Sequence, residues 1–162
     1  MRGTLAAVLF LALVSLALVG GCSQPQPRFS IAGATVDATH WCPGGAANAA
    51  YDLHARIDAR NDTSRPVTIE SATATMVLAA VTGPWLEPVG EAYDADTVRV
   101  TPTTVAANSR ATLETVIPSA CTSGRYGSGP SISGDYSVKV TLQTSAGKFA
   151  VTASNRHQIL AA

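Results

Sequence analysis

Hydrophobic and polar residues alternate along the chain in short runs that predict β-strands. The clearest run spans residues 51–60, where Tyr51, Leu53, Ala55, Ile57 and Ala59 alternate with charged or polar residues. This spacing gives a strand one apolar face and one solvated face, whereas a helix would distribute the charges all round. Similar runs predict strands at residues 29–37, 67–78, 97–101, 111–117, 136–142 and 149–153. Since no amphipathic helix pattern follows residue 21, we expect an all-β domain.

The breaks between these runs predict bulges, turns and loops. The apolar positions change parity at Gly33 and near Ser71, and a bulge in each strand would account for the change. Residues 61–66 have the Asn, Asp, Thr and Pro composition of a turn, and residues 145–147 should close a hairpin. Pro118 is expected to end the strand before it, and residues 156–160 to extend the last one. Loops are expected at residues 38–50, 82–96, 102–110 and 119–134.

The amino-terminal residues have the pattern of an export signal. A run from Leu5 to Val19 is apolar except for Ser15, and it follows a cationic start with Arg2. At about 15 residues the run would span roughly 22 Å as a helix, which is short for a bilayer core of about 30 Å. Gly20, Gly21 and Cys22 come directly after Val19.

This arrangement resembles the lipobox of bacterial lipoproteins. The resemblance implies cleavage before Cys22, a diacylglycerol on its thiol and a fatty acid such as palmitate on its new amino group. It implies a location on the exported side of the cell membrane or of an outer membrane. We therefore expect a signal peptide at residues 1–21, a lipid-anchored tether at residues 22–28 and a domain at residues 29–162. The alternatives are an ordinary cleaved signal and an uncleaved anchor.

Charge and cysteine content narrow the class of protein further. The chain carries 11 Lys and Arg against 11 Asp and Glu, which argues against a nucleic-acid partner because such proteins need a basic surface. Once Cys22 is lipidated, Cys42 and Cys121 remain, and a pair of cysteines in an exported chain favours a disulfide. The alternative is a reactive thiol at Cys42, although the chain has no nearby second cysteine to resolve it.

Two segments resemble those of immunoglobulin-like domains in bacterial envelope proteins. They are Gly134–Val140, which enters the sixth predicted strand, and Ala107–Leu113, which enters the fifth. The resemblance implies an immunoglobulin-like antiparallel β-sandwich of about seven strands. In that topology the second and sixth strands begin at one end, so Cys42 and Cys121, each upstream of its strand, would meet there. Antibody domains place their cysteines inside these strands, so an antibody-type core is not expected.

The same topology would gather the three longest loops at the end with the cysteines. Aromatic and arginine side chains on loops over a rigid scaffold are typical of a recognition surface. The candidate binding surface consists of Trp41, Trp85, Tyr93, Arg125 and Tyr126. The alternative is that the tryptophans plug the open end of the sandwich as local core.

The chain has no recognisable catalytic or cofactor motif. It lacks the Gly-x-Ser-x-Gly pattern of a hydrolase, and His40, His54 and His157 are too scattered to suggest a catalytic base. His54 falls on a charged strand face, where pairing with a carboxylate is expected. No metal ligand set and no cofactor are predicted. A group of acidic residues in one loop is interpreted as solvated; its members are Glu87, Glu91, Asp94 and Asp96.

The sequence therefore predicts a lipid-anchored envelope protein that acts as a binding or structural module and is more typical of a non-enzyme. Its expected partners are the membrane, through the lipid on Cys22, and an envelope protein or glycan. One alternative is an envelope enzyme or enzyme inhibitor that uses the loops around Cys42, Trp85 and Arg125. Another is an accessory subunit of a transport or secretion complex.

Overall fold

The computed structural model of the chain describes residues 26, 28–43, 48–121 and 132–161. Every regular element in this part of the chain is a β-strand. The strands are β1 (Phe29–Val36), β2 (Thr39–Cys42), β3 (Ala49–Asn61), β4 (Val67–Thr82), β5 (Ala92–Ala95), β6 (Arg99–Thr101), β7 (Thr104–Val105), β8 (Ser109–Cys121), β9 (Ser133–Thr144), β10 (Gly147–Thr152) and β11 (His157–Ala161). No helix within the described ranges is long and apolar enough to cross a membrane.

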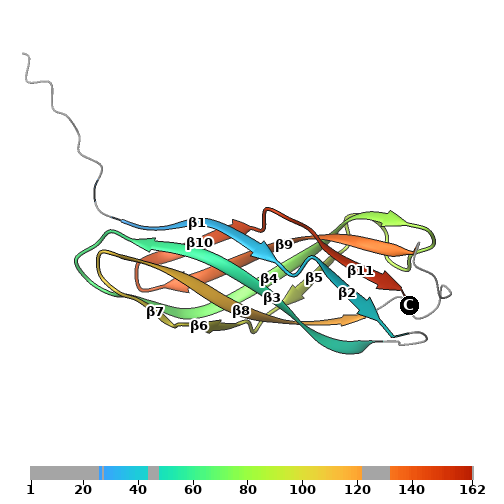
Figure 1. Ribbon diagram of the computed structural model, residues 1–162, viewed down its shortest axis with the longest axis horizontal. Helices are drawn as coiled ribbons and strands as arrows, with labels where there is room; N and C mark the ends of the chain where they lie inside the picture. The colour runs from blue at the N-terminus through green and yellow to red at the C-terminus, as the bar shows by residue number, and fades with distance from the viewer. Residues whose placement is uncertain (1–25, 27, 44–47, 122–131, 162) are drawn as a thin grey trace, which may run out of the picture.

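The strands form two sheets that pack face to face (Figure 1). One sheet has the order β1-β3-β8-β6, and the other has the order β2-β11-β9-β4-β5, with β10 beside β9 and β7 beside β4. Apart from the parallel pair of β2 and β11, the pairings are antiparallel. These orders match strands A-B-E-D and G-F-C-C′ of the immunoglobulin fold, with β10 and β11 sharing the role of G. The predicted immunoglobulin-like β-sandwich is confirmed.

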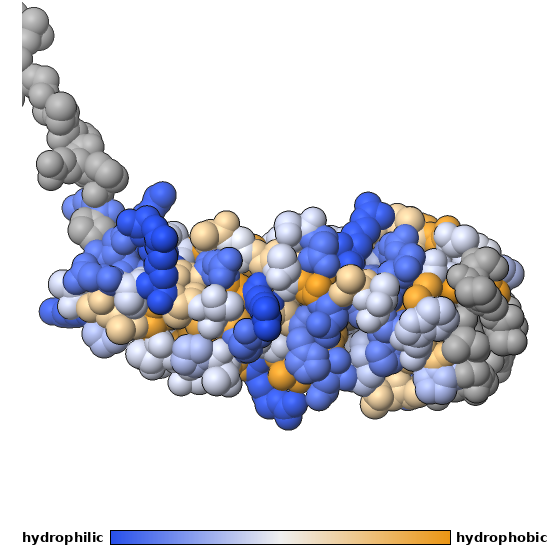
Figure 2. All heavy atoms as spheres, in the orientation of Figure 1, coloured by the Kyte–Doolittle hydropathy of each residue, from blue (hydrophilic) through white to orange (hydrophobic). Residues whose placement is uncertain are grey.

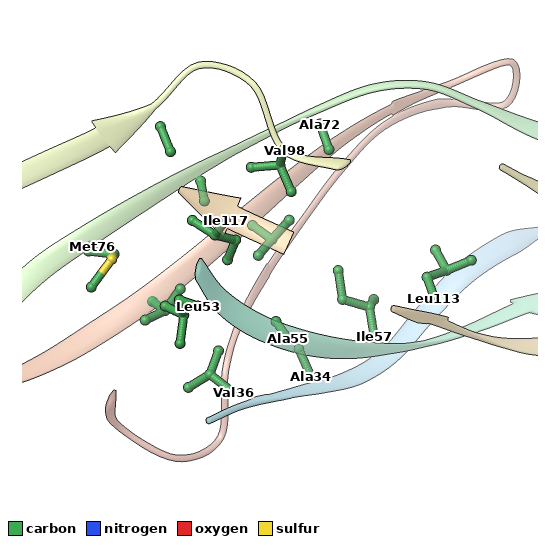
Figure 3. Packing of buried hydrophobic residues seen from close by; sticks show 14 of the residues in the cluster. Ala34, Val36, Leu53, Ala55, Ile57, Ala72, Met76, Val98, Leu113 and Ile117 are labelled. Carbon is green, nitrogen blue, oxygen red and sulfur yellow. The ribbon is translucent and has the colours of Figure 1, made fainter. Parts of the chain in front are cut away.

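The core lies between the sheets and is built from the inward positions of the long strands. Leu53 and Ile57 of β3 are fully buried, as are Val138 and Leu142 of β9. Figure 3 shows apolar side chains from both sheets meeting in this interior. The strict alternation of residues 51–60 therefore has the predicted cause, since the odd positions enter the core and the even ones face solvent.

The expected bulges and turns are present. The register between β1 and β3 shifts between Ile31 and Gly33, and the register between β4 and β9 shifts between Ile69 and Ser71. At the turn after β3, the Oδ1 atom of Asn61 accepts a hydrogen bond from the backbone N–H of Thr63 at 3.0 Å. The chain thus returns over its own strand through side-chain capping of the backbone.

Several predicted boundaries are wrong. Each of the expected loops at residues 38–50, 82–96 and 102–110 contains a short strand, namely β2, β5 and β7, which form by backbone pairing with β11 or β4. Residues 157–161 form the separate strand β11 and do not extend the strand before them. Pro118 does not end its strand, since β8 continues to Cys121. Proline is tolerated there because the pairing of β6 with residues 114–116 of β8 stops short of Pro118, so that ladder loses no hydrogen bond to the proline.

The sandwich has two distinct ends. At the amino-terminal end, Phe29 pairs with Asn61, next to the turn at residues 62–66. At the disulfide end, Ala49 pairs with Cys121, and β2 and β11 finish side by side (Figure 1). The 13 residues of β3 join the two ends and span roughly 40 Å at the usual rise of a strand. A tether attached before Phe29 therefore leaves from the end opposite the disulfide.

Candidate binding surface at the disulfide end

The disulfide closes one end of the sandwich. Cys42 at the end of β2 and Cys121 at the end of β8 are joined with a Cα–Cα distance of 5.7 Å, and both are buried. Since β2 belongs to one sheet and β8 to the other, the bond links the two layers. The predicted pairing of the two cysteines is confirmed.

Two histidines and a tyrosine pack together, and one of them, His40, lies beside the disulfide. The ring of His40 stacks on that of Tyr51, with centroids 3.8 Å apart and planes 7° from parallel. Tyr51 Oη lies 2.9 Å from Nε2 of His157, and the Nδ1 atom of His157 lies 2.8 Å from the backbone oxygen of Asp37. A carbonyl oxygen only accepts, so Nδ1 carries the proton, and Nε2 accepts the hydrogen bond that Tyr51 donates.

Burial perturbs both groups of this hydrogen-bonded pair. His157 is fully buried, and desolvation of its charged form lowers its pKa below the ordinary value, against an opposing contribution from the Asp37 carbonyl. Burial raises the pKa of Tyr51 to about 12. Both residues are therefore neutral near pH 7, which matches the hydrogen-bond directions that the geometry requires. The arrangement anchors β11, which carries His157, to β3.

The disulfide also brings three potential metal ligands together. A nitrogen of His40 and the sulfurs of Cys42 and Cys121 all lie within 4.8 Å of one another. Metals bind the thiolate form of cysteine, and in this state both sulfurs are bonded to each other. The cluster is therefore a packed disulfide with a neighbouring imidazole, and the disulfide leaves no thiolate for a metal.

The predicted aromatic residues have different roles. Trp85 is half-buried, its Nε1–H donates to Tyr136 Oη at 3.3 Å, and its ring packs against the backbone at Gly134. Trp41 is 55% exposed, and Tyr93 is 44% exposed with its hydroxyl donating to the carbonyl of Pro118 at 3.3 Å. Trp85 thus plugs the end of the sandwich, whereas Trp41 and Tyr93 present their rings to solvent.

Three of the predicted site residues fall in parts of the chain that the structure does not describe. They are Arg125 and Tyr126 of the candidate binding surface, and the predicted lipidation site Cys22. The described part of the candidate binding surface therefore consists of Trp41, Trp85 and Tyr93. Exposed apolar side chains of the same loop as Trp85 extend it, namely Leu86 and Val89.

A pocket beside Tyr93 was not predicted from the sequence. Its volume is about 210 Å³, with Met76 and Ile159 at its base and Tyr93 and Tyr136 among its walls. Glu87 and Glu91 also line it. Glu87 is half-buried, and its Oε2 atom is buried with no hydrogen-bond partner among the described residues. The interpretation of the acidic loop as fully solvated is therefore wrong for Glu87.

Charged residues outside this end form exposed pairs on the outer face of the four-stranded sheet. His54 lies 3.0 Å from Asp37, and Arg56 lies 3.2 Å from Glu114. Figure 2 shows hydrophilic side chains distributed along the visible length of the molecule. The predicted pairing of His54 with a carboxylate is confirmed, and exposed pairs of this kind contribute little to stability.

Comparisons with known proteins leave the function open. No protein-family model matches the chain, and no curated protein matches it. The seventh PapD-like domain of human CEP192 is similar in structure, with 10% identity, a TM-score of 0.32 and coverage of 95% of this chain and 98% of that one. AggA, the major subunit of aggregative adherence fimbriae type I from Escherichia coli, has 10% identity and a TM-score of 0.33, with 85% and 98% of the two chains covered.

Proposed function

We propose that the protein is a membrane-anchored envelope lipoprotein that binds a partner through the disulfide end of its β-sandwich. The lipid on Cys22 would hold the domain to the outer side of a membrane. The binding would need no catalysis, and the partner would be another component of the cell envelope. The single observation that carries the proposal is the position of exposed aromatic and apolar side chains at the end opposite the tether.

The position of the tether favours this orientation. Residues 22–28 precede β1, and six residue-to-residue steps from Cys22 to Arg28 reach at most roughly 20 Å. The amino-terminal end of the sandwich would therefore lie close to the bilayer. The disulfide end would project away from it by the length of β3, roughly 40 Å.

The composition of the disulfide end suits protein recognition. Large apolar side chains are exposed there on β2 and β5, the two edge strands of the larger sheet, and on the loop before β5, with Trp41 55%, Leu86 50%, Val89 58% and Tyr93 44% accessible. Aromatic side chains bury much area at small entropic cost, and they are enriched among the residues that dominate binding energy. The disulfide and the Trp85 plug beneath them provide the rigid support that a binding surface requires.

Photo-crosslinking in the native membrane tests this proposal. Benzoylphenylalanine would replace Trp41 or Tyr93 at the disulfide end, or the exposed Arg65 in the turn at the amino-terminal end. We expect both disulfide-end positions to yield the same crosslinked envelope component and Arg65 to yield none of it. Crosslinking to that component from Arg65 alone, or from none of the three positions, would contradict the proposal.

A further inference from the structure

The pocket beside Tyr93 combines an apolar base, aromatic walls and acidic groups. Met76 and Ile159 at its base are both buried in the sandwich core. Among the described residues that line the pocket, Glu87 and Glu91 carry carboxylate groups, and there is no lysine, arginine or histidine. The charge of the pocket is therefore complementary to a cation, and its base is complementary to an aliphatic stem.

The carboxylate of Glu87 points to a hydrogen-bond donor as the missing partner. Its Oε2 atom is buried without a hydrogen-bond partner among the residues that the structure describes. Buried polar atoms in proteins are nearly always paired, and each exception needs an explanation. A positively charged donor placed in the pocket would neutralise this carboxylate, and Glu91, which is exposed at the rim, would add to the attraction.

The size of the pocket favours a side chain over a whole small-molecule ligand. Its volume of about 210 Å³ lies below the roughly 300–1,000 Å³ of typical small-molecule sites. Leu86 and Val89, which are close in sequence to the pocket residue Glu87, are exposed apolar residues of the same loop. A pocket that receives one anchoring side chain within a larger apolar patch is typical of a protein–protein interface.

We propose that this pocket receives an arginine side chain of a partner polypeptide. The inference rests on the proposed function, because it specifies the chemistry of the partner at the disulfide end. The guanidinium group is planar, forms paired hydrogen bonds with a carboxylate and stacks on aromatic rings, and its aliphatic stem suits an apolar wall. Glu87 supplies the carboxylate, and Tyr93 and Tyr136 supply aromatic surface.

The methyl group of Met76 provides a direct reporter of binding. The chain contains two methionines, Met1 and Met76, and Met76 lines the pocket. The full chain would be labelled with carbon-13 at the methionine methyl groups and placed in micelles of an uncharged detergent. N-acetyl-argininamide is the probe, and N-acetyl-citrullinamide, which has nearly the same shape without the charge, is its matched control.

We expect N-acetyl-argininamide to shift the Met76 resonance in a saturable manner, and citrulline to bind at least tenfold more weakly. Glu87→Gln should weaken binding of the arginine probe about tenfold. Glu70→Gln, which removes the same charge from an exposed position of β4, should change it less than twofold. Glu91→Gln gives a second test at an exposed rim position in case Glu87→Gln does not fold.

Three results would overturn the assignment. The first is equal binding of N-acetyl-argininamide and N-acetyl-citrullinamide, and the second is unchanged binding of the arginine probe in both Glu87→Gln and Glu91→Gln. The third is a shift of the Met76 resonance with choline, tested as a cation without a guanidinium group, and no shift with N-acetyl-argininamide. The crosslinking experiment separates this outcome from a failure of the proposed function. If position 93 still crosslinks to a partner while N-acetyl-argininamide leaves the Met76 resonance of the wild-type chain unchanged, the binding module stands and the arginine pocket is wrong.

Discussion

Replacing Cys42 and Cys121 by alanine should remove a large part of the stability of the domain. The two residues are 79 positions apart in the sequence. On the chain-entropy model, closing a loop of that length stabilises the folded state by about 4.5 kcal/mol at 25 °C. Typical domains are stable by about 5–15 kcal/mol, so the double variant should be marginal.

Urea unfolding followed by circular dichroism measures this loss. Each single alanine variant should lose about as much free energy of unfolding as the double variant, because either substitution removes the same bond. The reduced wild-type protein is the matched control, since it loses the bond without losing the sulfur atoms. A loss below about 1 kcal/mol in the double variant would refute the argument that the disulfide stabilises the sandwich by joining its two sheets.

Other substitutions test the remaining parts of the structure. Asn61→Ala should cost roughly 2–4 kcal/mol in urea unfolding, because the buried amide donates to three backbone carbonyls at 2.8–3.2 Å. Gly134→Ala should cost about 1–3 kcal/mol and alter tryptophan fluorescence, because a Cβ there would lie 2.7 Å from the Trp85 ring. Trp41→Ala should leave the free energy of unfolding within about 0.5 kcal/mol of wild type while it reduces crosslinking from Tyr93, since Trp41 is largely exposed. Burial lowers the pKa of His157 in the folded chain. Below about pH 6.5 this histidine is therefore protonated in the unfolded chain but still neutral in the folded chain, so the free energy of unfolding should decrease as the pH is lowered, by at most about 1.4 kcal/mol per pH unit. Thermal unfolding from pH 7.5 to 5 should show this fall in wild type, and a His157→Leu variant that retains the same slope would contradict it.

The sequence predicts the fold well where burial determines the residue pattern. Leu53, Ala55 and Ile57 alternate with charged residues because each inward position lies against the opposite sheet. Gly33 and Ser71 mark real shifts of register because a strand cannot change its inward parity without an extra residue. These local signals suffice to count most strands and to assign the class of the fold.

The short strands at the sheet edges escape such prediction. β2 is stabilised as a strand by pairing with residues 158–161, more than a hundred positions later in the chain. β5 reads as a loop because three of its four side chains are exposed. In both cases backbone pairing with another strand, β11 for β2 and β4 for β5, and not side-chain periodicity, determines the structure.

The candidate site is only partly visible in the sequence for a similar reason. The pairing of Cys42 with Cys121 follows from cysteine count and topology, and the aromatic residues near them stand out by type. The difference between Trp85, which plugs the sandwich, and Trp41, which is exposed, depends on contacts with Gly134 and Tyr136 that no local pattern encodes. One Glu87 oxygen is also buried, in a residue that lines the same pocket as Tyr136 of β9 and Ile159 of β11, and no local pattern predicts this.

The anchoring of the domain through Cys22 is the claim on which the proposed orientation depends, and mass spectrometry of the mature amino terminus tests it most directly. The account predicts that the protein purified from native membranes begins at Cys22 and carries the added mass of a diacylglycerol on that residue. An amino-terminal peptide that retains residues 1–21, or one that begins at Cys22 without any lipid, would contradict it.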